Sequence, residues 1–281
     1  MFHNIYIFGL GMMGGSLAHA IKRGKNCKKV YAYDTCRQSL LFAKKNLLID
    51  DYDDKQFTLL KKSDLIIICA PVKKYDEIFK VIDKNISENA IVSDIGSIKT
   101  NITTSLDNCS VSLRRSFIGS HPLTGSEKYG IRNYQTNLYN NQYVLISPFN
   151  KNNGLLKEIT NFWKKIGCNC ITIKPRQHDS LLALTSHLPH ITSFVLVKNI
   201  LSKCPQGEID SYTGGGFRDF ARLANSDSEM WEGIISLNKS NIINSIDEFT
   251  NEIKNFKKIV KNGKSTEIKK YIEKIHKKLN S

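Results

Sequence analysis

The sequence lacks several features that mark particular classes of protein. It has no run of about 18 or more apolar residues, so we expect neither a transmembrane helix nor a membrane partner. The opening residues, MFHNIYIFGLGMMGG, contain no cationic region and no small-residue cleavage site, which argues against an export signal. These absences predict a cytoplasmic protein.

The sequence also lacks the cysteine pattern of a disulfide framework or a zinc site. Its seven cysteines are an odd number, and no second close pair accompanies Cys168 and Cys170. His187 and His190 lie about one helical turn apart, but no acidic or thiolate cluster accompanies them. We therefore expect reduced thiols and no metal.

Acidic residues are scarce, with 26 Asp and Glu against 41 Lys and Arg, for a net charge of +15. Such a balance is found in nucleic-acid-binding proteins, but the lysines here are dispersed. The densest basic stretch, Lys254 to Lys278, has an apolar opposite face, which is typical of solvated helices. We expect no nucleic-acid partner, and a general attraction for anionic small molecules.

A length of 281 residues with 41% hydrophobic content favours two domains. The first ~175 residues alternate short apolar runs with helix-like segments, which predicts a parallel α/β sheet. The expected strands are 4–8, 29–33, 64–69, 91–94, 116–119, 142–147 and 169–173. The expected helices lie near 12–23, 36–46, 73–82 and 154–167.

The chain from 178 onward shows no convincing strand. Residues 178–203 form a mostly apolar helical pattern that stops before Pro205, and Gly214–Gly216 form a glycine-rich turn. We place the domains at 1–175, a dinucleotide-binding domain, and 176–281, a helical substrate and dimerisation domain.

The last part of the chain predicts long helices. Ser226 and Glu229 have capping-box spacing, and apolar residues then keep helical spacing from Trp231 to Val260, about eight turns. Gly263 is typical of a helix stop, and 268–279 form one more amphipathic helix. A helix this long and apolar on one side needs a partner, so we expect a homodimer formed through the helical domain.

A glycine loop follows the first expected strand and leads into a helix. Gly9 permits the tight turn, Gly11 lets the backbone approach a pyrophosphate, and Gly14 allows close helix–strand contact. Asp34, at the end of the second strand, can accept hydrogen bonds from an adenosine ribose. The pattern predicts a Rossmann-type dinucleotide site.

The choice of cofactor depends on two side chains. Asp34 favours NAD because a carboxylate repels a 2′-phosphate, whereas Arg37 is a candidate phosphate partner that keeps NADP open. Met13 in the loop, and Ala70 and Pro71 directly after the strand at 64–69, are further candidate cofactor contacts.

Polar residues elsewhere supply the parts for oxidising an anionic alcohol. His121 follows a strand among turn-forming residues, so we expect it exposed at the carboxyl edge of the sheet, where it can take a hydroxyl proton. Ser97 could hydrogen-bond to His121 or to the substrate. Arg222 and Arg218 offer bidentate grips for a carboxylate, and His190 offers a donor to a keto or carboxylate oxygen.

Some of these residues have an equally good structural interpretation. Arg218 and Asp219 could form an ion pair that organises the glycine turn. Trp231 could be a packing anchor or a substrate contact. His190 could be a satisfied histidine in a core helix.

In order, the segments GLGMMGGSLA, GSIK, GSHPLTGSEKYG, SHLPH and GGGFRDFARLANSDSEMW resemble the prephenate/arogenate dehydrogenase family. The resemblance covers about residues 4 to 240. It implies an α/β, Rossmann-type N-terminal domain with NAD and an all-α C-terminal dimerisation domain. It also implies oxidative decarboxylation of prephenate to 4-hydroxyphenylpyruvate in tyrosine biosynthesis.

The resemblance implies a role for each matching residue. His121 would bind the ring hydroxyl as the hydrogen-bond acceptor in catalysis, with support from Ser97. His190 and Arg222 would bind the carboxylate-bearing groups of the substrate. Three further residues match the polar network and the substrate pocket: Glu127, Asp219 and Trp231.

Other interpretations stay open at this point. Arogenate is a rival substrate, and a dual-specificity cyclohexadienyl dehydrogenase fits the same residues. A non-catalytic dinucleotide-binding sensor and a more distant hydroxyacid dehydrogenase are alternatives of other classes. We expect a single-function enzyme, with no chorismate mutase domain before the chain and no regulatory ACT domain after it.

Overall fold

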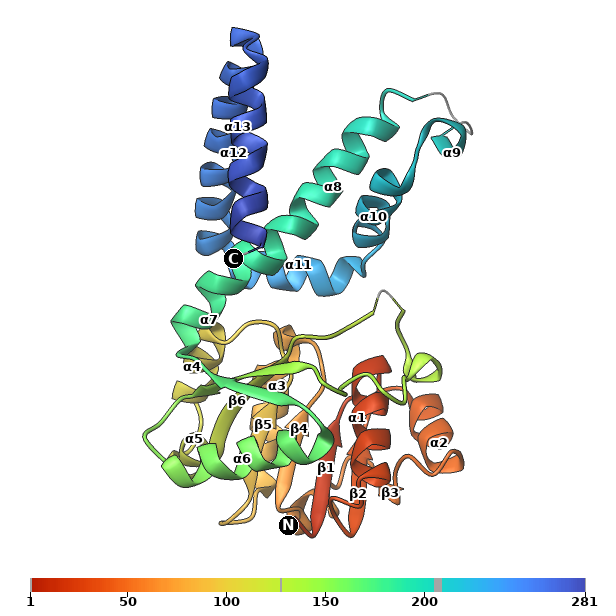
Figure 1. Ribbon diagram of the computed structural model, residues 1–281. Helices are drawn as coiled ribbons and strands as arrows, with labels where there is room; N and C mark the ends of the chain where they lie inside the picture. Colours follow the sequence, from red (N-terminus) through yellow and green to blue (C-terminus); the bar gives the residue numbers. More distant parts are fainter. Residues whose placement is uncertain (1, 127, 205–208, 281) are drawn as a thin grey trace.

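The computed structural model describes residues 2–126, 128–204 and 209–280, and Figure 1 shows a sheet-bearing part below a purely helical one. The strands are β1 (Asn4–Phe8), β2 (Lys29–Tyr33), β3 (Asp51–Tyr52), β4 (Leu65–Ile68), β5 (Ile91–Asp94), β6 (Phe117–Pro122), β7 (Tyr143–Pro148) and β8 (Asn169–Thr172). They form one sheet in the order β3-β2-β1-β4-β5-β6-β7-β8. We call this part the sheet domain and propose that it ends between β8 and the helix that begins at Pro175, close to the expected division.

The sheet is mixed, so the prediction of a parallel sheet is wrong for its last two strands. β1 to β6 run parallel, but β7 pairs antiparallel with β6, and β8 is parallel to β7. A parallel partner requires a crossover, usually a helix. Among the described residues between β6 and β7, the short 3-10 helix η3 (Ile131–Asn133) is the only helix, whereas α6 (Asn153–Ile166) connects β7 to β8.

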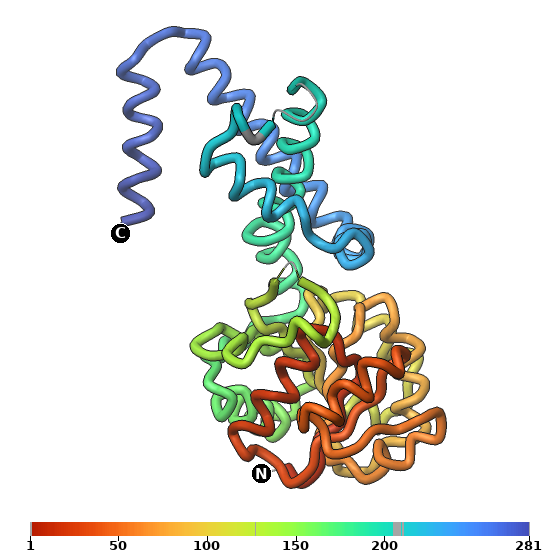
Figure 2. The backbone as a smooth tube through the Cα atoms, turned by 90° about the vertical axis from the view of Figure 1, so that its right-hand side faces the viewer, coloured from red at the N-terminus to blue at the C-terminus, as the bar shows by residue number. Residues whose placement is uncertain are grey.

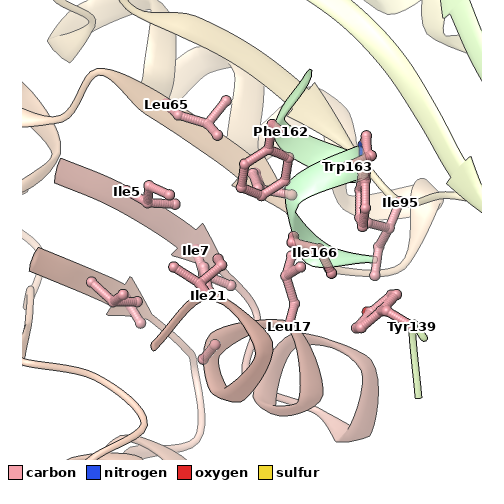
Figure 3. Packing of buried hydrophobic residues seen from close by; sticks show 14 of the residues in the cluster. Ile5, Ile7, Leu17, Ile21, Leu65, Ile95, Tyr139, Phe162, Trp163 and Ile166 are labelled. Carbon is pink, nitrogen blue, oxygen red and sulfur yellow. The ribbon is translucent and has the colours of Figure 1, made fainter. Parts of the chain in front are cut away.

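Alternate residues of the central strands face opposite sides of the sheet. Ile5 and Ile7 of β1 belong to one buried cluster and Tyr6 and Phe8 to another, as the two-residue period of a strand requires. Figure 3 shows Ile5 and Ile7 facing α1 and α6. The two faces are covered by helices α1 (Met12–Arg23), α2 (Arg37–Lys45) and α6 on one side, and α3 (Tyr75–Asn85), α4 (Thr100–Asp107) and α5 (Val111–Ser116) on the other.

The sequence predicted most of this domain. Strands β1, β2 and β5 and helix α1 have the expected bounds at both ends. β3, α4, α5 and the 3-10 helix η1 (Leu60–Lys62) were not expected, because each is too short to show a clear period. The helix expected near 73–82 is observed as the 3-10 helix η2 (Val72–Lys74) followed directly by α3.

The helical domain begins with one continuous helix, Pro175–Leu201. It comprises α7 (Pro175–Leu182), a π-helical turn η4 (Ala183–His187) and α8 (Leu188–Leu201). Contrary to the expectation from the sequence, this helix is apolar and long enough to cross a membrane by composition and length alone. Only 22% of its most apolar stretch of 18 residues is buried within the chain. The core or interface helix of a globular protein passes the same test.

The remaining helices are α9 (Ile209–Tyr212), α10 (Gly215–Ala224), α11 (Ser228–Leu237), α12 (Lys239–Asn262) and α13 (Ser265–Leu279). The prediction of one helix from 231 to 260 is wrong, because the chain breaks at Asn238, whose side chain donates to Asp179 O at 2.8 Å. The cap of α11 is Asp227 and not Ser226, since the Asp227 carboxylate accepts from Met230 N at 2.7 Å. Gly263, at φ 67°, ends α12 as expected.

Helices α12 and α13 project away from the sheet, and Figure 2 shows α13 standing apart from the rest of the chain. The pair meets near its turn, where the rings of Phe256 and Tyr271 lie 5.1 Å apart. Other apolar side chains of these two helices, Ile253, Ile272 and Ile275, are exposed. Apolar helix faces left open to water in one chain are typical of surfaces that a second subunit covers.

Candidate active site

The glycine loop between β1 and α1 has the backbone geometry of a phosphate cradle. Gly9 has φ +92°, and a Cβ on Gly14 would lie 2.0 Å from Gly9 O, so neither position accepts a side chain. A Cβ on Gly11 would meet nothing within 4 Å, which leaves open space where a pyrophosphate would approach. Gly11 is the N-cap of α1 and makes no side-chain cap, so the first N–H groups of the helix remain for an anion.

Asp34 joins the glycine loop to the end of β2. Its Oδ2 accepts from Leu10 N at 2.6 Å, and its Oδ1 accepts from Cys36 N at 2.7 Å. Each carboxylate oxygen can accept further hydrogen bonds, so Asp34 can hold both the loop and a ribose hydroxyl. Arg37 is exposed in the first turn of α2. These residues fit a nicotinamide dinucleotide.

A cavity of about 860 Å³ lies between the two domains, below α11 in Figure 1, at the carboxyl ends of β1, β4, β5 and β6. This is where parallel α/β sheets bind their ligands. The expected site residues that line it are Gly11, Met13, Ala70, Pro71, Ser97, His121, His190, Arg222 and Trp231. Gly9, Gly14 and Asp34 do not line the cavity: the two glycines set the backbone of the loop, and Asp34 accepts a hydrogen bond from Leu10 N within it.

His121 lies within β6 and is only 9% exposed, so the prediction of an exposed loop histidine is wrong. The strand continues to Pro122 because β7 pairs with it, placing His121 opposite Leu145. Its Nδ1 lies 2.9 Å from His178 Nε2. Burial lowers the pKa of His121 well below 6.5, and His178 and Lys99 lower it further, so the ring is neutral and can accept a proton.

A buried ion pair holds the loop that carries Ser97. Lys99 is fully buried, and its Nζ donates to Asp94 Oδ2 at 2.7 Å and to Gly96 O at 2.6 Å. Burial lowers the pKa of Lys99, and Asp94 opposes that shift. Ser97 lines the cavity, but within the described ranges no hydrogen bond joins it to His121.

His190, Trp231 and Arg222 form the helical wall of the cavity. The His190 ring stacks on Trp231 with centroids 4.2 Å apart, and its Nδ1 donates to Ser186 O at 3.0 Å. Burial and then Arg222 lower the pKa of His190, while the bond to Ser186 opposes them. Arg222, in the last turn of α10, has no ion-pair partner among the residues that the structure describes.

His187 has a structural environment. It is 1% exposed, its Nδ1 accepts from Asn238 Nδ2 at 3.2 Å, and its ring meets the edge of Trp231 at 6.0 Å. Burial lowers its pKa to about 4.

Comparison with known proteins agrees with this geometry. The model of the prephenate dehydrogenase nucleotide-binding domain matches residues 17–172, and that of the prephenate dehydrogenase dimerization domain matches 174–274. Prephenate dehydrogenase of Bacillus subtilis is 28% identical over 272 residues, which are 96% of this chain and 73% of that protein. Cyclohexadienyl dehydrogenase of Zymomonas mobilis is 28% identical over 258 residues, covering 90% of this chain and 87% of the relative.

Among solved structures, prephenate dehydrogenase from A. aeolicus in complex with hydroxyphenyl propionate and NAD+ superposes with a TM-score of 0.91. It is 31% identical, and the match covers 99% of this chain and 97% of that one. The chain belongs to the prephenate dehydrogenase family. The expected family, its dehydrogenase chemistry, and the fold of a nucleotide-binding domain followed by a helical dimerisation domain are confirmed. The expected cofactor, NAD, agrees with the matched domain and with the ligand of the A. aeolicus enzyme.

Two residues expected in the site of a prephenate dehydrogenase do not reach the cavity. Asp219 is exposed on α10, away from the lining, and Arg218 is exposed beside it. No ion pair joins these two neighbours among the described residues. Glu127 lies outside the described residues.

The sequence analysis did not identify His178 and Asp179 as residues near the active site. Both are buried in α7, and His178 Nδ1 lies 2.7 Å from Asp179 Oδ1. The pair occurs in the segment PRQHDSLL, directly after the last strand. No spacing within the sequence relates it to His121, which is 57 residues away.

Proposed function

We propose that this chain is an NAD-dependent prephenate dehydrogenase that converts prephenate to 4-hydroxyphenylpyruvate and CO2, a step in tyrosine biosynthesis. The observation that carries the proposal is one cavity lined by the glycine loop, the neutral His121 and Arg222. Support comes from the A. aeolicus relative, whose complex contains a hydroxyphenyl ligand and NAD+.

The cofactor and His121 take different parts in the proposed reaction. When bound, NAD supplies the acceptor for the hydride on the ring carbon that carries the hydroxyl group. His121 takes the hydroxyl proton, so that the carbonyl forms as the hydride leaves. The new carbonyl makes the ring carboxylate a good leaving group, and CO2 departs as the ring becomes aromatic.

The helical wall orients the anion. The Arg222 guanidinium offers paired donors to a substrate carboxylate. No acidic side chain among the described residues pairs with it, so its charge is available for this task. Trp231 is 5% exposed and closes the wall behind His190, which limits water at that side of the cavity. Binding of this kind fixes the ring carbon and its hydroxyl against the loop and His121.

The protonation state of His190 distinguishes the two candidate substrates. Because its Nδ1–H is donated to Ser186 O, neutral His190 offers only an acceptor at Nε2. Such an acceptor suits the ammonium group of arogenate, whereas the imidazolium donates to the keto acid of prephenate. Burial lowers the pKa of His190 in the free site, so binding of prephenate as proposed requires its anionic side chain to raise that pKa. With Arg222 beside it to hold a carboxylate, we propose prephenate as the substrate.

The test is the rate of nicotinamide reduction with prephenate and arogenate, each with NAD and NADP, at several pH values. We expect turnover with prephenate and NAD, and a ratio of kcat/KM for prephenate over arogenate that rises as the pH falls. Equal ratios at all pH values would remove His190 from substrate choice. Arogenate as the faster substrate throughout would instead establish an arogenate dehydrogenase, and comparable rates would establish a dual-specificity enzyme.

We also propose a cytoplasmic homodimer assembled through the helical domain. The match to a dimerization domain and the exposed apolar faces of α12 and α13 support this arrangement. Sedimentation equilibrium should give twice the mass of the chain, and a monomer at micromolar concentration would contradict it.

A further inference from the structure

A buried chain of hydrogen bonds leads away from the proposed base. His121 Nδ1 faces His178 Nε2 at 2.9 Å, and His178 Nδ1 faces Asp179 Oδ1 at 2.7 Å. His178 and Asp179 are 0% and 1% exposed, and neither lines the cavity. A chain of three buried polar groups is costly to maintain unless each member is satisfied, which makes its geometry informative.

Asp179, at the far end of this series of hydrogen bonds, determines which group donates in each of them. Asp179 Oδ1 accepts from Lys99 N at 2.8 Å, and Oδ2 accepts from Thr100 N at 2.7 Å. Burial raises the pKa of Asp179, but the hydrogen bonds from His178 and Thr100 outweigh it and leave the pKa below its ordinary value. Asp179 is therefore a carboxylate, which only accepts, so His178 Nδ1 must donate.

The tautomers of both histidines follow from that donor. Burial lowers the pKa of His178 despite the neighbouring carboxylate, so its ring is neutral. A neutral imidazole has one N–H, so His178 Nε2 is an acceptor and His121 Nδ1 donates to it. His121 is then left with a lone pair on Nε2, which has no partner among the described residues.

We propose that His178 and Asp179 are positioning residues that hold His121 in the tautomer with its hydrogen on Nδ1, leaving Nε2 to take the substrate proton. This inference rests on the proposed function of His121. On proton transfer Nε2 gains the hydrogen, and Nδ1–H remains donated to His178. The Asp179 carboxylate, one imidazole away, stabilises the resulting positive charge.

The same residues join the base to the domain junction. Asp179 lies on α7 of the helical domain, yet it accepts from the N-terminus of α4 in the sheet domain. Its own carbonyl accepts from Asn238 at 2.8 Å, where α11 meets α12. The nearest other charged or titratable groups around His121 are Lys99, paired with Asp94, and His187.

The first test compares two variants of similar size. His178→Leu removes the acceptor, whereas the side-chain carbonyl of His178→Gln can still accept from His121 Nδ1. General-base catalysis contributes about 10²–10⁴, so we expect His178→Leu to lower kcat by about ten- to a hundredfold, with the Kd for NAD unchanged within about twofold. His178→Gln should recover most of the loss. A His178→Leu protein with wild-type kcat and pH profile would overturn the proposal.

The second test needs no turnover, and the readout is taken on the wild-type protein, with one variant used only to assign the resonances. In protein labelled with ¹⁵N-histidine, the His121 resonances, assigned by their loss in His121→Asn, should show a hydrogen on Nδ1 and none on Nε2 at neutral pH. The opposite tautomer would overturn the proposal even if the enzyme is active. Failure of the wild-type protein to turn over either substrate would refute the proposed function instead, and the spectrum would still decide the tautomer.

Discussion

The two domains supply the site with different kinds of group. The sheet domain contributes backbone and buried groups, namely a glycine loop, strand ends and a histidine 9% exposed. The helical domain contributes side chains from helices that bury little apolar surface in the single chain. Its buried hydrophobic residues, among those described, are Leu182, Ala183, Trp231, Ile234 and Ile242.

The difference shows how the site depends on each part. The sheet domain has its own two-sided core, so it can hold the cofactor loop in place without help. The helical wall is anchored at the junction, where Ile98 of the sheet domain packs with Trp231 and Ile234, and Lys73 pairs with Glu232. Cofactor binding and substrate binding should therefore respond to different mutations.

The largest expected effect is at the base. His121→Asn should lower kcat by roughly 10²–10⁴, because the hydroxyl proton loses its acceptor. NAD affinity, measured by titration, should not change, since the glycine loop is independent of this side chain. A fall of less than about tenfold in a folded protein would remove His121 from its role.

The next effect concerns the helical wall. Arg222→Gln removes a charged hydrogen-bonding partner worth about 1.5–3 kcal/mol, so kcat/KM for prephenate should fall by about ten- to a hundredfold. Arg218→Gln is the matched control, because Arg218 is exposed on the same helix but does not line the cavity. Equal losses in the two variants would contradict the assignment of Arg222.

A smaller effect separates two glycines of the cofactor loop. A methyl group at Gly14 meets Gly9 O, and overpacking of this kind costs about 1–3 kcal/mol. Gly14→Ala should lower the Tm and weaken NAD binding by about tenfold or more. Gly11→Ala should weaken NAD binding while the Tm of the free protein is unchanged, since its Cβ meets nothing. Loss of Tm in both variants would show that Gly11 is structural.

The smallest effect is on stability in acid. His187 has a pKa of about 4 when folded against about 6.5 when unfolded, so between these values the unfolded chain binds the proton and the folded chain does not. The free energy of unfolding should fall as the pH drops through this window, by about 2 kcal/mol at pH 5 from this residue. Thermal unfolding between pH 7 and pH 5 measures the decrease, and His187→Gln should reduce it. A Tm independent of pH in the wild type would contradict the assigned pKa.

The sequence predicted those groups whose role follows from residues close to them in the sequence. The glycine loop, Asp34 and the β1–α1–β2 unit follow from adjacent residues and a clear period. His121 was found, but its burial was not, because burial depends on β7 pairing with β6 across a long loop. His178 and Asp179 were missed for a related reason, since their meeting with His121 exists only in the folded chain.

The helical domain was predicted in outline only. The break at Asn238 is set by hydrogen bonds to Asp179 and His187, which no period in the sequence reveals. Helix α10 begins within the three glycines, where intrinsic preference favours a turn, and it packs against α8. Tertiary contacts overrode local propensity at both places.

The most direct test of the proposed reaction is its stoichiometry with prephenate and NAD. We expect equal amounts of reduced nicotinamide, CO2 and 4-hydroxyphenylpyruvate, because hydride loss, proton transfer to His121 and decarboxylation form one sequence. Reduced nicotinamide without CO2 would contradict it and indicate a simple alcohol dehydrogenase. No reduction by a folded protein that binds NAD would indicate a non-catalytic dinucleotide-binding protein.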